Sequence, residues 1–326
     1  MRLKLVPQGT KVDFMSPSGI ALVFSGFLMV ASVALFFTLG LNYGIDFRGG
    51  SMLMVETPEP VAVGEYRDVL ASLDVGDTSV TEINDPAAEL TGAAQNAAMI
   101  RIEQQDDDPA IQADAIKLVS DALRAEFDGL QILSTESVGA KVSGELIQAG
   151  VLAVVAAIAA VLFYIWLRFE WQFSVGAVAA LVHDIVLTIG VFALVGLEFN
   201  LAIIAAILTI VGYSLNDTVV VFDRVRENLR RYKKMDLAEV LNLSINETLS
   251  RTVMTSVTTL IALISLYVLG GEVIRGFTFA MIWGVVVGTY SSVFVASAVL
   301  LRLDVKRDWT TGSDGKAGTQ FANIDA

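Results

Sequence analysis

Cysteine is absent from this chain of 326 residues, and histidine occurs once, at His183. The lack of cysteine excludes disulfide bonds, thiolate catalysis and thiolate metal sites, and a single histidine excludes multi-histidine metal clusters. Charged residues are also scarce, at 17% of the chain, whereas a soluble domain usually carries about a quarter. Apolar residues make up 54% instead, and this balance predicts an integral membrane protein.

Long apolar stretches that match the length of a membrane span, about 20 residues, recur along the chain. The hydrocarbon offers no water to the backbone, so each stretch is predicted to be a helix. The first is too long for the apolar region of a cleavable signal peptide and lacks a cleavage site at its end. The six predicted spans are Ile20–Leu41, Leu146–Leu167, Phe173–Leu197, Phe199–Phe222, Thr252–Leu269 and Phe277–Leu301.

Lysine and arginine in the short connections set the expected orientation, because they favour the cytoplasmic side. With the N-terminus inside, the two short outer connections hold only Arg275. We therefore expect a cytoplasmic N-terminus at 1–19 and a cytoplasmic tail at 302–326 that is disordered after Asp308. The inner segment 224–250 is expected to be a cytoplasmic loop that lies as an amphipathic helix on the membrane surface. Most of the net charge of −13 then belongs to the outer segment.

The outer segment, 42–145, is the only stretch long enough for a water-soluble domain. Alternating and helical patterns follow one another in the order β-α-β-β-α-β, which is known to close into one sheet with helices on one face. We therefore expect a ferredoxin-like domain between the first span and spans two to six, which occupy 146–301. The expected elements are strands at 51–56, 78–83, 98–103 and 130–138 and helices at 61–73 and 109–127.

The heptad Gly-Ile-Asp-Phe-Arg-Gly-Gly follows the first span, with Gly44, Asp46, Gly49 and Gly50 as its notable members. Glycine permits a tight turn into the first strand, so a structural junction is the preferred interpretation over a ligand site. No nucleophile elbow, paired-histidine motif or phosphate loop is present, and no catalytic residue is predicted.

Polar residues inside spans are costly and are suspected of function. His183 and Asp184 lie near the middle of the third span, and Asn216 and Asp217 lie toward the inner end of the fourth. Arg251 begins the fifth span at the same side, so Asp217 and Arg251 are expected to approach each other. Two hypotheses remain open: these groups join helices by polar contacts, or they form a proton or ion relay.

The motifs around these residues resemble the SecD/SecF family of protein-export membrane proteins, on its SecF side. The heptad at 44–50 resembles the family's signature after the first span, and Val182-His183-Asp184 resembles its third-span motif. The run from Gly212 to Asn228 resembles its fourth-span motif. Arg251-Thr252, followed by Thr255-Ser256, resembles the start of its fifth span. The resemblance covers nearly the whole chain.

The resemblance implies a function and a set of partners. The family belongs to the resistance-nodulation-division superfamily, whose membrane core has two six-helix halves, and SecD would supply the other half. The pair is expected to assist protein translocation across the cytoplasmic (inner) membrane, driven by protons or sodium, after the SecYEG channel and the SecA motor have begun it. YajC is a further expected partner, and an unfolded polypeptide is the expected cargo.

The same resemblance gives Asp217 and Arg251 the ion-coupling role and places a further essential aspartate on SecD. No cofactor, metal or nucleic acid is expected, and the role is not enzymatic. One alternative is half of a small-molecule exporter of the same superfamily. Another is an intramembrane aspartyl protease that uses Asp184 and Asp217, although a Gly-x-Gly-Asp pattern is absent before Asp217. A purely structural scaffold would leave the buried charges unexplained.

Overall fold

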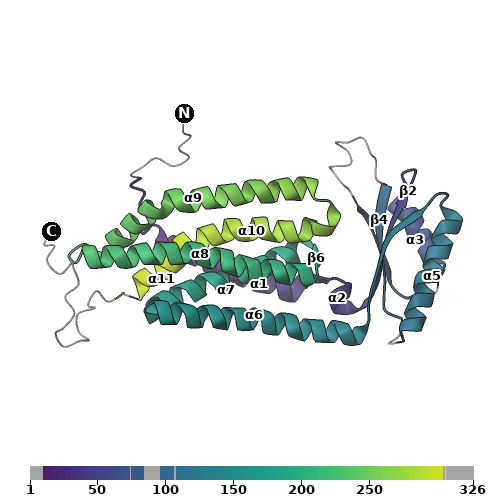
Figure 1. Ribbon diagram of the computed structural model, residues 1–326, viewed down its shortest axis with the longest axis horizontal. Coiled ribbons are helices and arrows are strands. Elements are labelled where there is room, and N and C mark those ends of the chain that lie inside the picture. The colour runs from purple at the N-terminus through teal and green to yellow at the C-terminus, as the bar shows by residue number, and fades with distance from the viewer. Residues whose placement is uncertain (1–9, 74, 84–95, 106–107, 304, 306–326) are drawn as a thin grey trace.

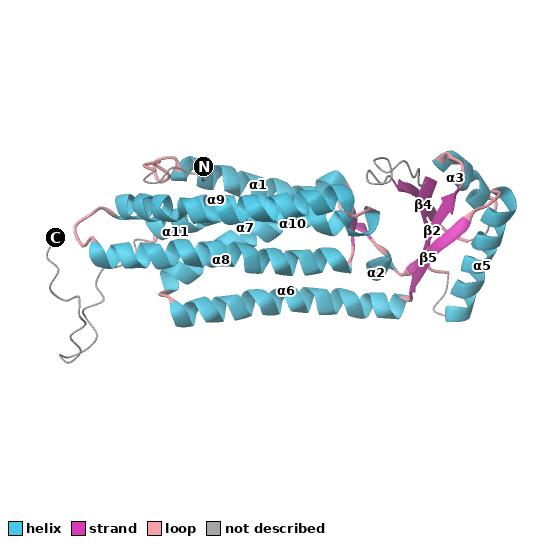
Figure 2. Cartoon of the chain, turned by 45° about the horizontal axis from the view of Figure 1, so that its top comes forward, coloured by secondary structure: helices cyan, strands magenta, loops and turns pink. Residues whose placement is uncertain are grey.

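The computed structural model describes residues 10–73, 75–83, 96–105, 108–303 and 305. Long helices lie side by side in a bundle, and a sheet domain stands at one end of it (Figures 1 and 2). The predicted disordered tail lies outside the described residues.

Six helices of the described part are long and apolar enough to cross a membrane, as the sequence predicts. The last of them is interrupted by a π-helical turn, Ser292–Ala296, between α10 and α11. The helices are α1 (Ser18–Leu39), α6 (Ala140–Arg168), α7 (Trp171–Val195), α8 (Leu201–Arg231), α9 (Leu237–Leu269), α10 (Arg275–Ser291) and α11 (Ser297–Arg302).

The segment 224–250 is not a separate surface helix, and this expectation was wrong. Helix α8 continues to Arg231, and α9 begins at Leu237 after a short turn. The apolar residues of this segment, such as Val225 and Leu241, are buried in one apolar cluster. The charged residues on their outer faces gave the segment its mixed pattern.

The helices form an inner and an outer group. Between 44% and 67% of the most apolar window is buried in α7, α8 and α10–α11, whereas α1, α6 and α9 bury between 6% and 11%. Small residues allow the close contacts, because Gly284 faces Ile210 of α8 and Gly288 lies against Ser214. Helix α10 therefore packs closely on α8 at these two glycines.

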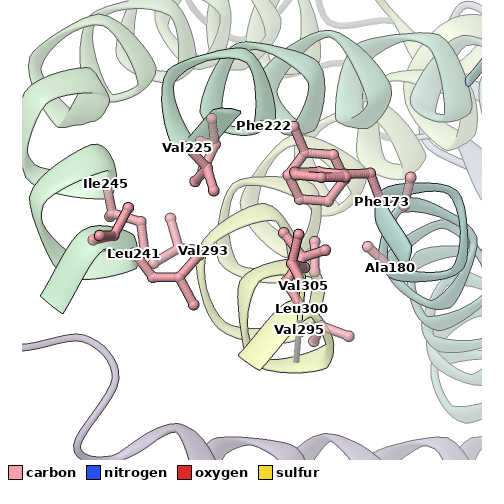
Figure 3. Close-up of a cluster of buried hydrophobic side chains, with 14 of the residues drawn as sticks. Phe173, Ala180, Phe222, Val225, Leu241, Ile245, Val293, Val295, Leu300 and Val305 are labelled. Carbon is pink, nitrogen blue, oxygen red and sulfur yellow. The ribbon is translucent and has the colours of Figure 1, made fainter. Parts of the chain in front are cut away.

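An apolar cluster lies at the end of the bundle where α8 turns into α9 (Figure 3). Phe173 of α7 and Phe222 of α8 meet edge to face, with ring centroids 5.2 Å apart. Val225 of α8 and Leu241 of α9 extend the cluster toward Val293 of the π-helical turn. Apolar side chains therefore pack against the π-helical turn from several sides.

The domain beside the bundle has the predicted order of strands and helices. Its four strands are antiparallel and lie in the order β3-β4-β2-β5, and both helices contribute to one apolar core with the sheet. The elements are β2 (Gly50–Thr57), α3 (Val63–Ala71), β3 (Thr78–Ile83), β4 (Asn96–Ile102), α5 (Pro109–Glu126) and β5 (Gln131–Val138).

The heptad forms the junction between α1 and this domain. A short strand β1 (Asn42–Tyr43) pairs in parallel with β6 (Glu198–Phe199), and the short helix α2 (Ile45–Arg48) follows. Gly49 and Gly50 have φ of 76° and 108°, a region that residues with a side chain rarely adopt. The glycine turn into β2 is therefore confirmed.

We expect Gly50→Ala to lower the stability of the chain by about 1–3 kcal/mol. A methyl group at this position would meet the carbonyl oxygen of Ile102 in addition to the unfavourable φ. Thermal unfolding in mild detergent measures the effect, and Gly64→Ala in α3 is the control, since its methyl group would meet open space. Equal melting temperatures for the two variants would contradict the role of Gly50.

Candidate functional site

Asp217 lies in the interior of the bundle, on the face of α8 that meets α9 and α10. Its side chain is 7% exposed, and it stands about 24 Å along α8 from Leu201. Oδ1 accepts a hydrogen bond from Thr252 Oγ1 of α9 at 2.6 Å, and Oδ2 accepts one from Ser292 Oγ at 2.7 Å. Hydroxyl groups from two other helices thus hold both carboxylate oxygens.

Asp184 and His183 form a second buried group on α7, and each is 1% exposed. Asp184 Oδ2 accepts hydrogen bonds from Ser214 Oγ of α8 at 2.6 Å and Ser291 Oγ of α10 at 2.9 Å. Asp184 Oδ1 lies 3.0 Å from Nδ1 of His183. His183 therefore bonds to its sequence neighbour rather than to another helix, and its Nε2 has no hydrogen-bond partner among the described residues.

The two carboxylates are connected through consecutive serines. Ser291 ends α10 and Ser292 begins the π-helical turn, and each donates to a different aspartate. A π-helical turn inside a membrane helix is uncommon and is frequently found at functional sites. The structure thus brings Asp184 and Asp217 into one polar region.

The serines were missed by the sequence analysis, although a signal was present. Gly284, Gly288 and Ser291 recur at helical spacing in the sixth span, which places small residues on one face. That face meets α8, as the contacts of the two glycines show. The π-helical turn has no comparable sequence signal.

Arg251 and Asn216 do not enter this interior, since both side chains are exposed. The expected approach of Arg251 to Asp217 is not seen: Thr252, one residue later, makes the contact, and Arg251 forms no salt bridge within the described part of the chain. One residue along a helix is a rotation of about 100°. Because α8 and α9 are antiparallel, the residues that precede Asp217 and Thr252 lie on the same exposed side of the helix pair.

The heptad reaches the beginning of α8. Asp46 Oδ2 accepts a hydrogen bond from the backbone N–H of Leu201, the first residue of α8, at 2.9 Å. A carboxylate at a helix N-terminus satisfies a free N–H group and suits the helix dipole. Asp46 therefore fixes the first residue of the helix that carries Asp217, a contact that the junction interpretation did not anticipate.

An ion pair between Arg101 and Glu198 connects the sheet domain with the same place. Arg101 lies on β4 and Glu198 on β6, and their side chains are about one-fifth and one-quarter exposed. Burial raises the pKa of Glu198 above its ordinary value; Arg101 opposes the shift, whereas the nearby carboxylates of Asp46 and Glu136 add to it. Arg101 thus pairs with the acidic residue whose pKa is raised by burial.

Two protein-family descriptions match the chain. "Protein export membrane protein SecD/SecF, C-terminal" matches residues 118–306, which is more than half of the sequence. "SecD/SecF GG Motif" matches residues 34–57, which include the heptad.

Individual relatives agree with these matches. Protein translocase subunit SecF of Cereibacter sphaeroides is 55% identical over 325 residues, which cover 100% of this chain and 99% of the relative. Protein translocase subunit SecDF of Brucella abortus is 42% identical over 315 residues, or 96% of this chain and 40% of the relative.

The fold is similar to that of a solved structure. The crystal structure of SecDF, described as a translocon-associated membrane protein from Thermus thermophilus, matches with a TM-score of 0.80 and 34% identity. The match covers 93% of this chain, and this chain spans 40% of that structure.

The raised pKa of Glu198 gives a stability prediction. The folded protein keeps a proton on this carboxyl at pH values where the unfolded chain has released it, so ionisation of Glu198 costs stability. We expect the melting temperature of the unaltered protein, measured relative to Glu198→Gln, to rise as the pH falls from neutral through the raised pKa. Glu82→Gln, at an exposed position of β3, controls for the loss of one charge, and an identical pH dependence of both differences would refute the assignment.

Proposed function

Because this chain belongs to the SecD/SecF family of protein-export membrane proteins, we propose that it is the SecF-type accessory subunit of the Sec translocase and uses the proton motive force. The relatives are named translocase subunits, and the chain is a multi-pass membrane protein like them. The observation that carries the proposal is Asp217, a carboxylate inside a membrane helix whose only described partners are neutral hydroxyls.

Asp217 is the ion-coupling residue in this proposal. A carboxylate that is surrounded by hydroxyl groups keeps hydrogen-bond partners whether or not it carries a proton, because a hydroxyl both donates and accepts. An arginine or lysine in the same place would favour only the ionised form. The geometry around Asp217 suits a group that gains and loses a proton, and the same oxygens offer ligands to sodium.

Asn216 and Arg251 face the partner chain in this proposal. Their side chains are exposed on one side of the α8–α9 pair, where contact with lipid would be costly for polar groups. SecDF relatives carry a SecD part in the same chain as the SecF part, which supports SecD as the partner that covers this side. An acidic group of SecD would then pair with Arg251.

The other assignments follow from the same role. The chain acts in the cytoplasmic (inner) membrane with both termini in the cytoplasm, since its short inner connections are basic. It acts with the SecYEG channel, the SecA motor and YajC on an unfolded polypeptide at the outer face. The hydrogen bond of Asp46 to the beginning of α8 is a route by which movement of α8 would reach the outer domain.

The alternatives find less support. The names of the relatives favour protein translocation over small-molecule export. An aspartyl protease needs two carboxylates that share one site. Here each carboxylate has its own hydrogen-bond donors. Ser214 and Ser291 donate to Asp184, whereas Thr252 and Ser292 donate to Asp217. A non-enzymatic role therefore fits the geometry better.

We expect Asp217→Asn to abolish the stimulation of translocation by a proton gradient and to leave ATP-driven translocation unchanged. The amide keeps the size of the side chain and its contact with Thr252 but cannot take up a proton. The measurement is the fraction of a translocated polypeptide protected from protease in vesicles with this chain, SecD, SecYEG and SecA, with and without the gradient. Asp223→Asn, an exposed aspartate of the same helix, is the control, and unchanged stimulation in Asp217→Asn would end the proposal.

We expect Arg251→Met to lose the same stimulation while the amount of folded protein stays normal, because the side chain of Arg251 is exposed in this chain. Arg251→Lys keeps the positive charge and should restore part of the stimulation. Quantifying the folded chain by size-exclusion chromatography separates the two roles. A lower yield of folded protein with normal stimulation per molecule would make Arg251 structural.

A further inference from the structure

Ser291 and Ser292 each have two acceptors within reach. Ser292 Oγ lies 2.7 Å from Asp217 Oδ2 and 3.1 Å from the carbonyl oxygen of Thr289. Ser291 Oγ lies 2.9 Å from Asp184 Oδ2 and 3.2 Å from the carbonyl oxygen of Gly288. Each hydroxyl hydrogen can therefore point to a carboxylate or to a backbone carbonyl without losing a partner.

The surroundings of Asp184 contain no fixed positive charge. The helices packed on α7 are α1, α6, α8 and α10–α11, and their stretches 18–39, 146–167, 201–222 and 276–301 contain no lysine or arginine. The titratable groups that face the pair are Tyr290, whose ring centre lies 6.0 Å from that of His183, and Asp217 across the serines. His183 is therefore the one basic group that the described residues place beside Asp184.

We propose that Asp184 is a second proton-holding carboxylate of the coupling site, and that Ser291 and Ser292 are positioning residues that link its proton occupancy to that of Asp217. The proposal rests on the proposed function of Asp217 and extends it to α7. It assigns a role to the π-helical turn, which begins at Ser292, directly after Ser291 at the end of α10.

The linkage works through the direction of the hydroxyl hydrogens. When Asp217 takes up a proton, its O–H donates to Ser292 Oγ, and the hydrogen of Ser292 turns to the carbonyl of Thr289. The hydroxyl hydrogen of Ser291, the preceding residue, has the same two alternatives: it can point to Asp184 or to the carbonyl of Gly288. No buried polar group of the two serines loses its partner in either state, so neither state carries the penalty of an unsatisfied donor.

His183 completes the second site. Its Nδ1 faces Asp184, and its Nε2 has no hydrogen-bond partner among the described residues although the side chain is 2% exposed. A proton that arrives at Nε2 gives an imidazolium beside the carboxylate, and one that leaves restores the neutral ring. The His183–Asp184 pair can therefore gain or lose one proton while Asp184 keeps its hydrogen bond from Ser291.

The first test measures the carboxyl groups directly. Infrared difference spectra of the full chain in lipid vesicles, recorded over a pH series, show the C=O band of each protonated buried carboxyl. We expect two such bands, of which Asp184→Asn removes one and Asp217→Asn removes the other. We also expect Asp184→Asn to move the titration midpoint of the remaining band by more than about one pH unit, as for coupled sites. An unmoved midpoint, or no band that depends on Asp184, would overturn the inference.

The second test uses the serines, whose substitution keeps both carboxylates. Ser291→Ala and Ser292→Ala should each shift the pH dependence of proton-driven translocation, and threonine at either position should restore it. Ser297→Ala is the matched control, since among the described residues this buried hydroxyl donates only to the backbone carbonyl of Ser292. Shifts of equal size in all three variants would show a merely structural effect and would overturn the role of the serines.

The outcomes separate this inference from the function on which it rests. If Asp217→Asn abolishes proton-driven stimulation while Asp184→Asn retains it with an unaltered pH profile, Asp217 couples alone and the inference is wrong. If Asp217→Asn keeps the stimulation, the proposed function itself fails, whatever the spectra show. Loss of stimulation in both variants, together with the shifted carboxyl band, supports the linked pair.

Discussion

The hydrogen bonds between buried carboxylates and hydroxyls are the interaction on which the rest of this bundle depends. An ionisable side chain at the centre of a membrane helix costs about 2.5–3.5 kcal/mol on insertion scales, whereas a polar contact between membrane helices usually contributes less than about 1 kcal/mol. The hydroxyls of Ser214, Thr252, Ser291 and Ser292 therefore reduce the cost of Asp184 and Asp217 without removing it. This balance favours the functional interpretation of the two carboxylates over a purely structural one.

Close approach of the helices is what makes these bonds possible. Gly284 and Gly288 allow α10 to approach α8 closely. Gly190 of α7 lies against Ser32 and allows the same close approach of α1. The three most buried spans, α7, α8 and α10–α11, carry the two aspartates and the two serines that donate to them. Helix α8 has a defined contact along its whole length, from Asp46 at its first residue, through Asp217, to Asn228, which donates to Ser244 and Glu247 of α9.

The features that were predicted correctly from the sequence are those that the pattern of apolar residues determines. The six spans follow from hydropathy, and the order of strands and helices in the sheet domain follows from their alternation, so both agree with the described part of the structure. The expected surface helix at 224–250 was wrong because the exposed end of a long helix and a surface helix have the same amphipathic pattern. Only the burial of residues such as Val225 distinguishes the two. The contact of Thr252 in place of Arg251 depends on helix rotation, which hydropathy does not fix. The π-helical turn depends on packing and could not be read from residue types.

The partners of Asp217 have a consequence for biosynthesis. Its donors Thr252 and Ser292 lie 35 and 75 residues later in the chain, so α8 is synthesised before either hydroxyl exists. Helix α8 also has the lowest hydropathy of the six, 1.7, whereas α6 reaches 2.6. Newly made α8 therefore has neither of the two described hydroxyl donors for Asp217 until α9 and the end of α10 have been synthesised. The carboxylate that the proposed function uses thus obtains these two hydrogen bonds only after two later helices have been added.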